Sequence, residues 1–142
     1  MKVLIAVDGS KCSLRAVAHA VRMMEACGTH QAFEVHLLNV QTPLPGSVGM
    51  FVGGKDLEDY HREEGFKQLA PARAILDRAA VPCTPHISVG RPGEVIDRQA
   101  RELGVDQIVM GTRGLGNVAD IVLGSTSEDV LRLVGVPVLL VK

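Results

Sequence analysis

The sequence contains no tryptophan, few aromatic residues and no excess of positive charge. Aromatic residues make up 3% of the 142 residues, and fifteen Lys and Arg are balanced by sixteen Asp and Glu, which leaves a formal net charge of −1. A protein that follows a nucleic-acid backbone needs a basic face, and one that stacks on bases needs aromatic side chains. We therefore expect no nucleic-acid partner.

Long apolar runs are also missing. The longest extends from Val136 to Val141, whereas a membrane-spanning helix needs about 20 apolar residues. Met1 and Lys2 lead directly into a strand-like run, without the successive regions of a secretory signal. We expect a protein of the cytoplasm that has no membrane partner.

Neither cysteine nor histidine occurs at a metal-binding spacing. Cys12, Cys27 and Cys83 form no CxxC pair, and the five histidines form no HxxxH or HExxH motif. Free thiols in a reducing compartment are the expected state of such cysteines. The sequence therefore predicts no metal site made by side chains and no metal-dependent catalysis.

The composition is typical of one globular domain that covers residues 1–142. Hydrophobic residues make up 46% of the chain and charged residues 22%, close to the average of globular proteins. A chain of this length buries roughly 70% of its unfolded surface, so it needs no disulfide or metal to hold it together.

Short apolar runs alternate with longer amphipathic segments. The apolar runs are rich in Val, Ile and Leu, as in strands buried on both faces, and they lie at residues 2–8, 33–40, 84–89, 107–110 and 136–141. Strands that alternate with helices favour a parallel sheet with right-handed crossovers. The sequence predicts an α/β fold, an open parallel five-stranded sheet with helices on both faces.

Capping residues mark the ends of two of the helices between these strands. Ser10 is a suitable N-cap for a helix that stops near Gly28. Pro92 opens a second helix, and Gly104 follows its end. Both helices are therefore predicted with defined boundaries.

The remaining segments are less regular. We expect residues 41–54, with two prolines and four glycines, to form a mobile loop. A long helix over residues 56–80 contains Pro71, which we expect to kink it or divide it in two. A final helix after residue 124 is predicted to turn three side chains to the core: Val130, Leu131 and Val134.

The fold class itself predicts where a ligand binds. Open parallel sheets hold ligands beyond the carboxyl ends of their strands, at the point where the strand order reverses. The segments that reach this edge are residues 8–10, 40–41, 90–91 and those from 111 onward.

Two segments imitate known phosphate-binding motifs. Residues 49–56 match GxxxxGK[ST] except that Asp56 replaces the hydroxyl that would hold Mg²⁺, and no apolar strand runs directly into them. Residues 114–119 match GxGxxG/A, but no acidic residue follows about twenty positions later to bind a ribose. We interpret the first as an ordinary loop and reject a dinucleotide site at the second.

The segment from Met110 to Thr126 is more informative. Gly111 and Gly114 allow the backbone to turn tightly and to approach a ligand. Gly124, Ser125 and Thr126 precede a helix, whose free N–H groups and dipole favour an anion. Arg113 adds a donor suited to phosphate oxygens. The alternative is that the glycines serve only as turns and Ser125 only as an N-cap.

The same residues match a family signature. Gly111-x2-Gly114, nine residues and then Gly124-Ser125 resembles the G-x2-G-x9-G-[ST] motif of the ATP-binding branch of the universal stress protein family. The resemblance spans the whole chain. It includes the strand end at residues 7–10, the turn at residues 90–92 and the closing run at residues 136–141.

This resemblance implies a sheet order of 3-2-1-4-5 and an ATP, or AMP or ADP, in the crevice between strands one and four. Mg²⁺ or Mn²⁺ would then be held mainly by the phosphates and water. Asp8 would meet the adenosine end, although a turn or capping carboxylate is the alternative, and Val40 would lie against adenine unless it is plain strand core. The residues implied to contact nucleotide are Ala6, Val7, Asp8, Val40, Met110, Gly111, Thr112, Arg113, Gly114, Gly124, Ser125 and Thr126.

The expected function is that of a binding module without catalytic residues. Hydrolysis needs a positioned water and charge stabilisation at the γ-phosphate; Arg113 could supply the charge, but the sequence offers no convincing general base. A slow ATPase or a self-phosphorylating enzyme modified at Ser125 or Thr126 is one alternative. A scaffold with a vestigial cleft is another.

The closing strand predicts a homodimer. The run from Val136 to Val141 would lie at a sheet edge in the order that the resemblance implies. An exposed apolar edge is an aggregation hazard unless it is paired. Antiparallel pairing with a second copy gives a closed two-fold dimer.

Overall fold

Five parallel strands form one sheet in the order β3-β2-β1-β4-β5. The structure is a computed structural model, and it describes residues 1–28, 32–44, 46, 53–115 and 123–142. The predicted fold class and strand order are confirmed. The strands are β1 (Lys2–Ala6), β2 (Glu34–Gln41), β3 (Cys83–Val89), β4 (Gln107–Gly111) and β5 (Val138–Val141).

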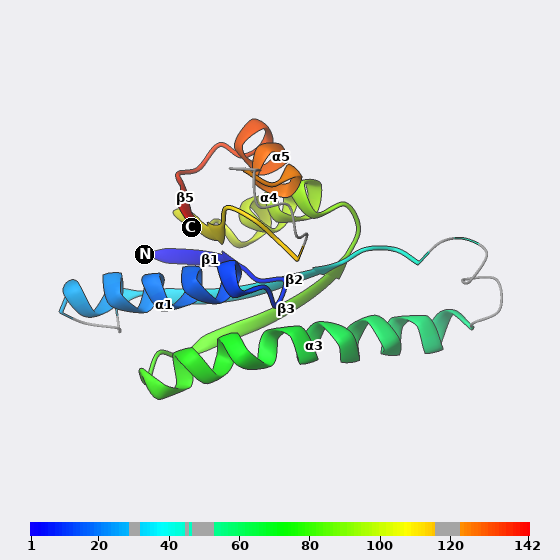
Figure 1. The fold of residues 1–142 in the computed structure, drawn as a ribbon, viewed down its shortest axis with the longest axis horizontal. Helices are drawn as coiled ribbons and strands as arrows, with labels where there is room; N and C mark the ends of the chain where they lie inside the picture. Colours follow the sequence, from blue (N-terminus) through cyan, green and yellow to red (C-terminus); the bar gives the residue numbers. More distant parts are fainter. Residues whose placement is uncertain (29–31, 45, 47–52, 116–122) are drawn as a thin grey trace.

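Helices cover both faces of the sheet, as predicted (Figure 1). On one face, α1 (Lys11–Ala26) and α3 (Gly54–Arg78) pack on side chains such as Ile5 and Leu37. On the other face, α4 (Pro92–Leu103) and α5 (Ser125–Leu133) pack on Leu4, Leu38 and Ile108. Alternate residues of β1 therefore belong to different cores, which is why this strand is apolar from Val3 to Ala6.

The predicted caps are present. The Ser10 side chain accepts a hydrogen bond from the Ser13 N–H at 3.1 Å and so begins α1. Pro92 is the first residue of α4, and Gly104 ends that helix in the left-handed conformation at φ 61°. Ser10 and Gly104 satisfy backbone groups that the helix ends leave open, and Pro92 lacks the N–H group that would otherwise stay open at the start of α4.

The prediction that Pro71 could divide its helix is wrong, because α3 runs unbroken from Gly54 to Arg78. Proline removes one backbone hydrogen bond and disfavours a helix interior by about 3 kcal/mol. Here its ring lies on the exposed side, while Leu69, Ala72 and Leu76 are fully buried against the sheet. Burial of such side chains contributes roughly 1.5–3 kcal/mol for each large one, which outweighs the cost.

Three further predictions need correction or fall outside the described residues. Leu131 does not enter the core and is 48% exposed, because α5 buries the stripe made by Ser127 and Val130. The closing strand begins at Val138, two residues later than predicted. Half of the predicted loop 41–54, and parts of the rejected motifs at 49–56 and 114–119, lie outside the described residues. Among the described residues, no helix has the length and apolar character that crossing a membrane requires.

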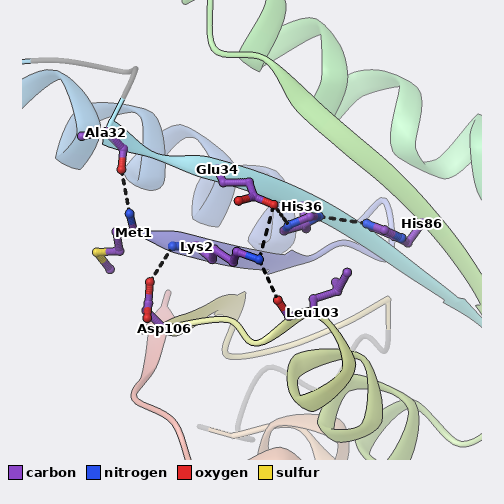
Figure 2. Close-up of polar contacts among 8 residues, drawn as sticks. All are labelled: Met1, Lys2, Ala32, Glu34, His36, His86, Leu103 and Asp106. Atoms are coloured by element: carbon purple, nitrogen blue, oxygen red, sulfur yellow. Dashed lines mark hydrogen bonds and ion pairs between the residues drawn. The ribbon is translucent and has the colours of Figure 1, made fainter.

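Two histidines form a hydrogen-bonded pair between β2 and β3 (Figure 2). Nδ1 of the buried His36 lies 3.0 Å from Nε2 of His86, and Nε2 of His36 lies 3.1 Å from a carboxylate oxygen of Glu34. Lys2 approaches the same carboxylate at 3.7 Å. Because the carboxylate only accepts, neutral His36 carries its proton on Nε2 and accepts from His86 through Nδ1.

This pair predicts a loss of stability in mild acid. Burial, together with the neighbouring His36, lowers the pKa of His86 from its ordinary value of 6.5. The unfolded chain then binds a proton more readily than the folded one, so the free energy of unfolding falls as pH drops below about 6.5. We expect urea unfolding at pH 7.5, 6 and 5 to show this decline, and to show a smaller one for His86→Gln, which keeps a donor but cannot titrate. His19→Gln, a change in α1 outside the pair, should show the same fall in unfolding free energy with pH as the native protein. A fall in His86→Gln as large as that of the native protein would contradict the assignment of this acid sensitivity to His86.

Candidate functional site

A cavity of about 580 Å³ lies at the carboxyl ends of β1, β2 and β4. Its volume is in the range of pockets that hold small molecules. In the sheet, β1 has β2 on one side and β4 on the other, so the strand order reverses at this point. This is the location that the fold class predicts for a ligand.

Of the residues predicted to contact nucleotide, all except Thr112 line this cavity. Those that do are Ala6, Val7, Asp8, Val40, Met110, Gly111, Arg113, Gly114, Gly124, Ser125 and Thr126. The Thr112 side chain is buried instead, with its hydroxyl 3.7 Å from the Cys12 thiol. The Thr112 carbonyl accepts a hydrogen bond from the Gly124 N–H at 2.7 Å. The Thr112 backbone therefore holds Gly124, at the start of α5, close to the end of β4.

Asp8 is held in a tight turn at the end of β1. One carboxylate oxygen accepts the Ser10 N–H at 2.9 Å, and Gly9 between them has φ +81°, which favours glycine. A Cβ placed at Gly114 would lie 2.6 Å from the other carboxylate oxygen of Asp8. Glycine at position 114 thus lets the loop after β4 come within contact distance of the Asp8 carboxylate.

Gly111 allows β4 to end directly against the first turn of α1. A Cβ at this position would lie 2.9 Å from the Cys12 carbonyl carbon and 3.0 Å from the Ser13 nitrogen. Both are backbone atoms, which cannot move aside as the end of a side chain can. Glycine is therefore required here by packing, as well as lining the cavity.

The N-terminus of α5 faces the cavity. Gly124 is the N-cap and provides no side-chain cap, while Ser125 is the first helical residue. The interpretation of Ser125 as a simple N-cap is therefore wrong. The first N–H groups of a helix lack partners within it, and the dipole makes this end positive. With Arg113 also on the lining, this end of the cavity suits an anion.

The Cys12 thiol connects α1 to the end of β5. Its sulfur lies 3.2 Å from the Val141 carbonyl oxygen. Burial raises the pKa of this thiol. Hydrogen bonds, among them those with the Arg113 backbone and the Thr112 side chain, lower it by a larger amount, so the pKa lies below its ordinary value. Cys12 is buried, with 6% of the residue exposed.

Sequence reasoning assigned no ligand contact to a set of amide side chains from β2 and α3 at this cavity. Gln41 and Gln68 line it, and Asn39 lies buried between them. Gln41 follows the predicted strand 33–40 and belongs to the segment 40–41 that the fold class predicted at the ligand edge, and the structure places it at the end of β2. Gln68 comes from the middle of α3, where no motif marks it. In the described ranges, no cluster of three or more His, Cys, Asp or Glu side chains could hold a metal ion.

Comparison with known proteins gives a consistent result over the full chain. The profile of the universal stress protein family matches residues 1–142. The universal stress protein YxiE of Bacillus subtilis is 29% identical, with 99% of this chain and 98% of the relative covered.

Two solved structures extend this comparison. That of MJ0577 from Methanocaldococcus jannaschii has a TM-score of 0.83 and 33% identity, covering 99% of this chain and 94% of the other. A universal stress protein solved in complex with cAMP has a TM-score of 0.71 and 25% identity, covering 100% and 97% of the two chains.

Proposed function

The chain belongs to the universal stress protein family, and on this premise we propose that it is a regulatory module that binds ATP, or AMP or ADP, in the cavity between β1 and β4. The observation that carries the proposal is the pairing of an anion-suited helix N-terminus with glycines on one wall of a cavity of about 580 Å³. The cAMP complex of a relative supports an adenine nucleotide as the ligand.

The residues present fit such a ligand. Gly114 and Gly124 keep side-chain atoms out of the loop beside the α5 N-terminus, where a Cβ would lie 2.6 Å from Asp8 and 3.3 Å from the Thr112 carbonyl. We assign the phosphates to this end, held by Arg113 and by the N–H and hydroxyl groups of Ser125 and Thr126. A divalent cation, Mg²⁺ or Mn²⁺, would be held mainly by the phosphates.

The other lining residues are assigned to the rest of the nucleotide. Asp8, with Ala6 and Val7 just before it, is proposed to meet the adenosine end. Val40 is proposed to lie against adenine through its backbone. Met110 and Gly111 are proposed to line the ribose side.

We propose a binding role rather than catalysis. Among the described residues that line the cavity, Asp8 is the sole carboxylate, and one of its oxygens is engaged by the Ser10 N–H. A general base must reach the attacking water or hydroxyl. In the proposed arrangement Asp8 meets the adenosine end, away from the terminal phosphate.

Nucleotide release and turnover test this proposal together. Protein denatured by heat should release adenine nucleotide detectable by chromatography, and stripped protein should bind one ATP–Mg²⁺ per chain in calorimetry. Turnover should stay far below about 1 per second, the lower range of ordinary enzymes. Hydrolysis at that rate would identify an ATPase, and a phosphate mass shift on Ser125 or Thr126 a self-phosphorylating enzyme. No nucleotide and no binding would leave a scaffold with a vestigial cleft.

We further propose that the chain forms a homodimer through β5 in the cytoplasm. β5 is an edge strand whose four residues are all half-buried. Pairing with a second copy would satisfy its outer backbone groups. All three cysteines lie in the described residues and are free thiols, which supports a reducing compartment.

A further inference from the structure

Three amide side chains form a hydrogen-bonded chain at the cavity, two from β2 and one from α3, which lies on the face of the sheet opposite α5 (Figure 1). Asn39 Nδ2 donates to the Val7 carbonyl at 2.8 Å and to Gln68 Oε1 at 2.8 Å. Gln41 Nε2 donates to Asn39 Oδ1 at 2.7 Å. Asn39 is fully buried, and both Gln41 and Gln68 line the cavity. The Val7 carbonyl therefore holds Asn39 in place, and Asn39 in turn holds the Gln41 and Gln68 side chains that line the cavity.

The anchor fixes which end of each amide is available to a ligand. A backbone carbonyl only accepts, so the Asn39 atom beside Val7 must be the NH₂ group. Both of its hydrogens are then used, which requires the Gln68 atom beside it to be the oxygen. Asn39 Oδ1 only accepts, so Gln41 must turn its NH₂ group toward it. Within the described residues, the amide ends without a partner are the Gln68 NH₂ donor and the Gln41 carbonyl acceptor.

A donor and an acceptor of this kind are complementary to an amino base. Adenine has an exocyclic amine that donates beside a ring nitrogen that accepts, and hypoxanthine has a carbonyl and a ring N–H in the same two positions. If the phosphates lie at the α5 N-terminus, as proposed above, the base lies toward β2 and α3, where these amides are. A site that hydrogen-bonds one pattern rejects its reverse strongly, because buried polar groups are otherwise left unpaired.

We infer that Gln68 and Gln41 determine base specificity, with Asn39 as a positioning residue, and that they select an amino base over a keto base. Gln68 donates to the ring nitrogen, and Gln41 accepts from the exocyclic amine. This inference rests on the proposed nucleotide binding, and it adds residues from α3 and β2 that the glycine signature does not contain.

Calorimetric titration with ATP, ITP and tripolyphosphate tests the inference. ATP and ITP differ only in the donor and acceptor pattern of the base, and tripolyphosphate reports the phosphate end alone. The native protein should bind ATP at least about tenfold more tightly than ITP. Gln68→Met, which has similar length and no donor, should weaken ATP binding about tenfold and bring the two nucleotides within about threefold. Gln68→Glu, which presents an acceptor, should move the preference toward ITP, and tripolyphosphate affinity should be unchanged by Gln68→Met.

The outcomes separate this inference from the proposed function. Protein that binds ATP and ITP equally, or variants that leave the ratio unchanged, would overturn base reading and leave nucleotide binding standing. Protein that binds none of the three ligands would overturn both. If a Gln68 variant does not fold, Gln41→Met provides the same test, because loss of the acceptor should also reduce the ratio of ATP to ITP affinity.

Discussion

A Gly114→Val, Gly124→Val double variant is expected to lose at least about a hundredfold in ATP affinity while it remains folded. Neither glycine has a positive φ, so valine is compatible with the backbone at both positions. A Cβ at Gly114 would lie 2.6 Å from an Asp8 carboxylate oxygen, and one at Gly124 would lie 3.3 Å from the Thr112 carbonyl. The added groups would displace Asp8 and take the space proposed for phosphates. A hundredfold loss corresponds to about 2.8 kcal/mol of binding free energy.

The chain offers a matched control for this variant. Nothing lies within 4 Å of a Cβ built at Gly54 or Gly135, and neither has a positive φ. A Gly54→Val, Gly135→Val variant therefore adds the same two side chains in open space and should bind ATP as the native protein does. Calorimetry with ATP–Mg²⁺, together with circular dichroism of all three proteins, provides the comparison. If the Gly114, Gly124 variant bound ATP within threefold of the native protein, the cavity would not be the nucleotide site.

The part of the fold that could be predicted depends on neighbouring residues. Apolar runs such as that of β1, whose Val3, Leu4 and Ile5 are fully buried, are recognisable because both faces are covered. Ser10 and Gly104 mark helix ends through their own backbone or side-chain chemistry. The strand order, in contrast, was implied by the family resemblance, since no local signal fixes which strands become neighbours.

The features that could not be predicted depend on contacts between distant elements. Pro71 is tolerated because the residues beside it are anchored in the core, which the local sequence does not reveal. A Cβ at Gly65 would lie 2.6 Å from Ile87 of β3, so α3 lies unusually close to the sheet there. This close packing positions α3 along β2, where Gln68 reaches Asn39 from 29 residues away.

The two parts of the candidate site also differ in whether the sequence predicted them. Glycines and the α5 N-terminus lie in one continuous segment, and their spacing made that end of the cavity predictable. The amide end is assembled from β2 and α3, and it became apparent only once the hydrogen bonds were known. The proposed phosphate contacts therefore belong to a family motif, whereas the proposed base contacts belong to this chain's own packing.

Blocking the outer edge of β5 is expected to convert the proposed dimer to a monomer. The carbonyl of Pro137 accepts a hydrogen bond from Ile108 of β4, and that of Val141 accepts one from Thr112 just after β4, each at 2.9 Å. Backbone groups alternate in direction along a strand, so Leu139 also faces β4, and the N–H groups of Val138 and Leu140 point away from the sheet. Leu140→Pro removes one outward donor, and proline is tolerated at such edge positions.

Light scattering at micromolar concentration should then give twice the chain mass of 15.1 kDa for the native protein and the single mass for Leu140→Pro. We expect the dimer dissociation constant to rise at least about a hundredfold, because antiparallel pairing of so short a strand has few hydrogen bonds to lose. Leu140→Val keeps the donor and should remain dimeric, whereas Leu139→Pro removes a bond to β4 and should lower stability instead.

Native protein at the monomer mass would contradict the dimer, and a dimeric, folded Leu140→Pro would place the interface elsewhere. A monomer that still binds ATP would show that the cavity is complete within one chain, since all its lining residues belong to a single copy.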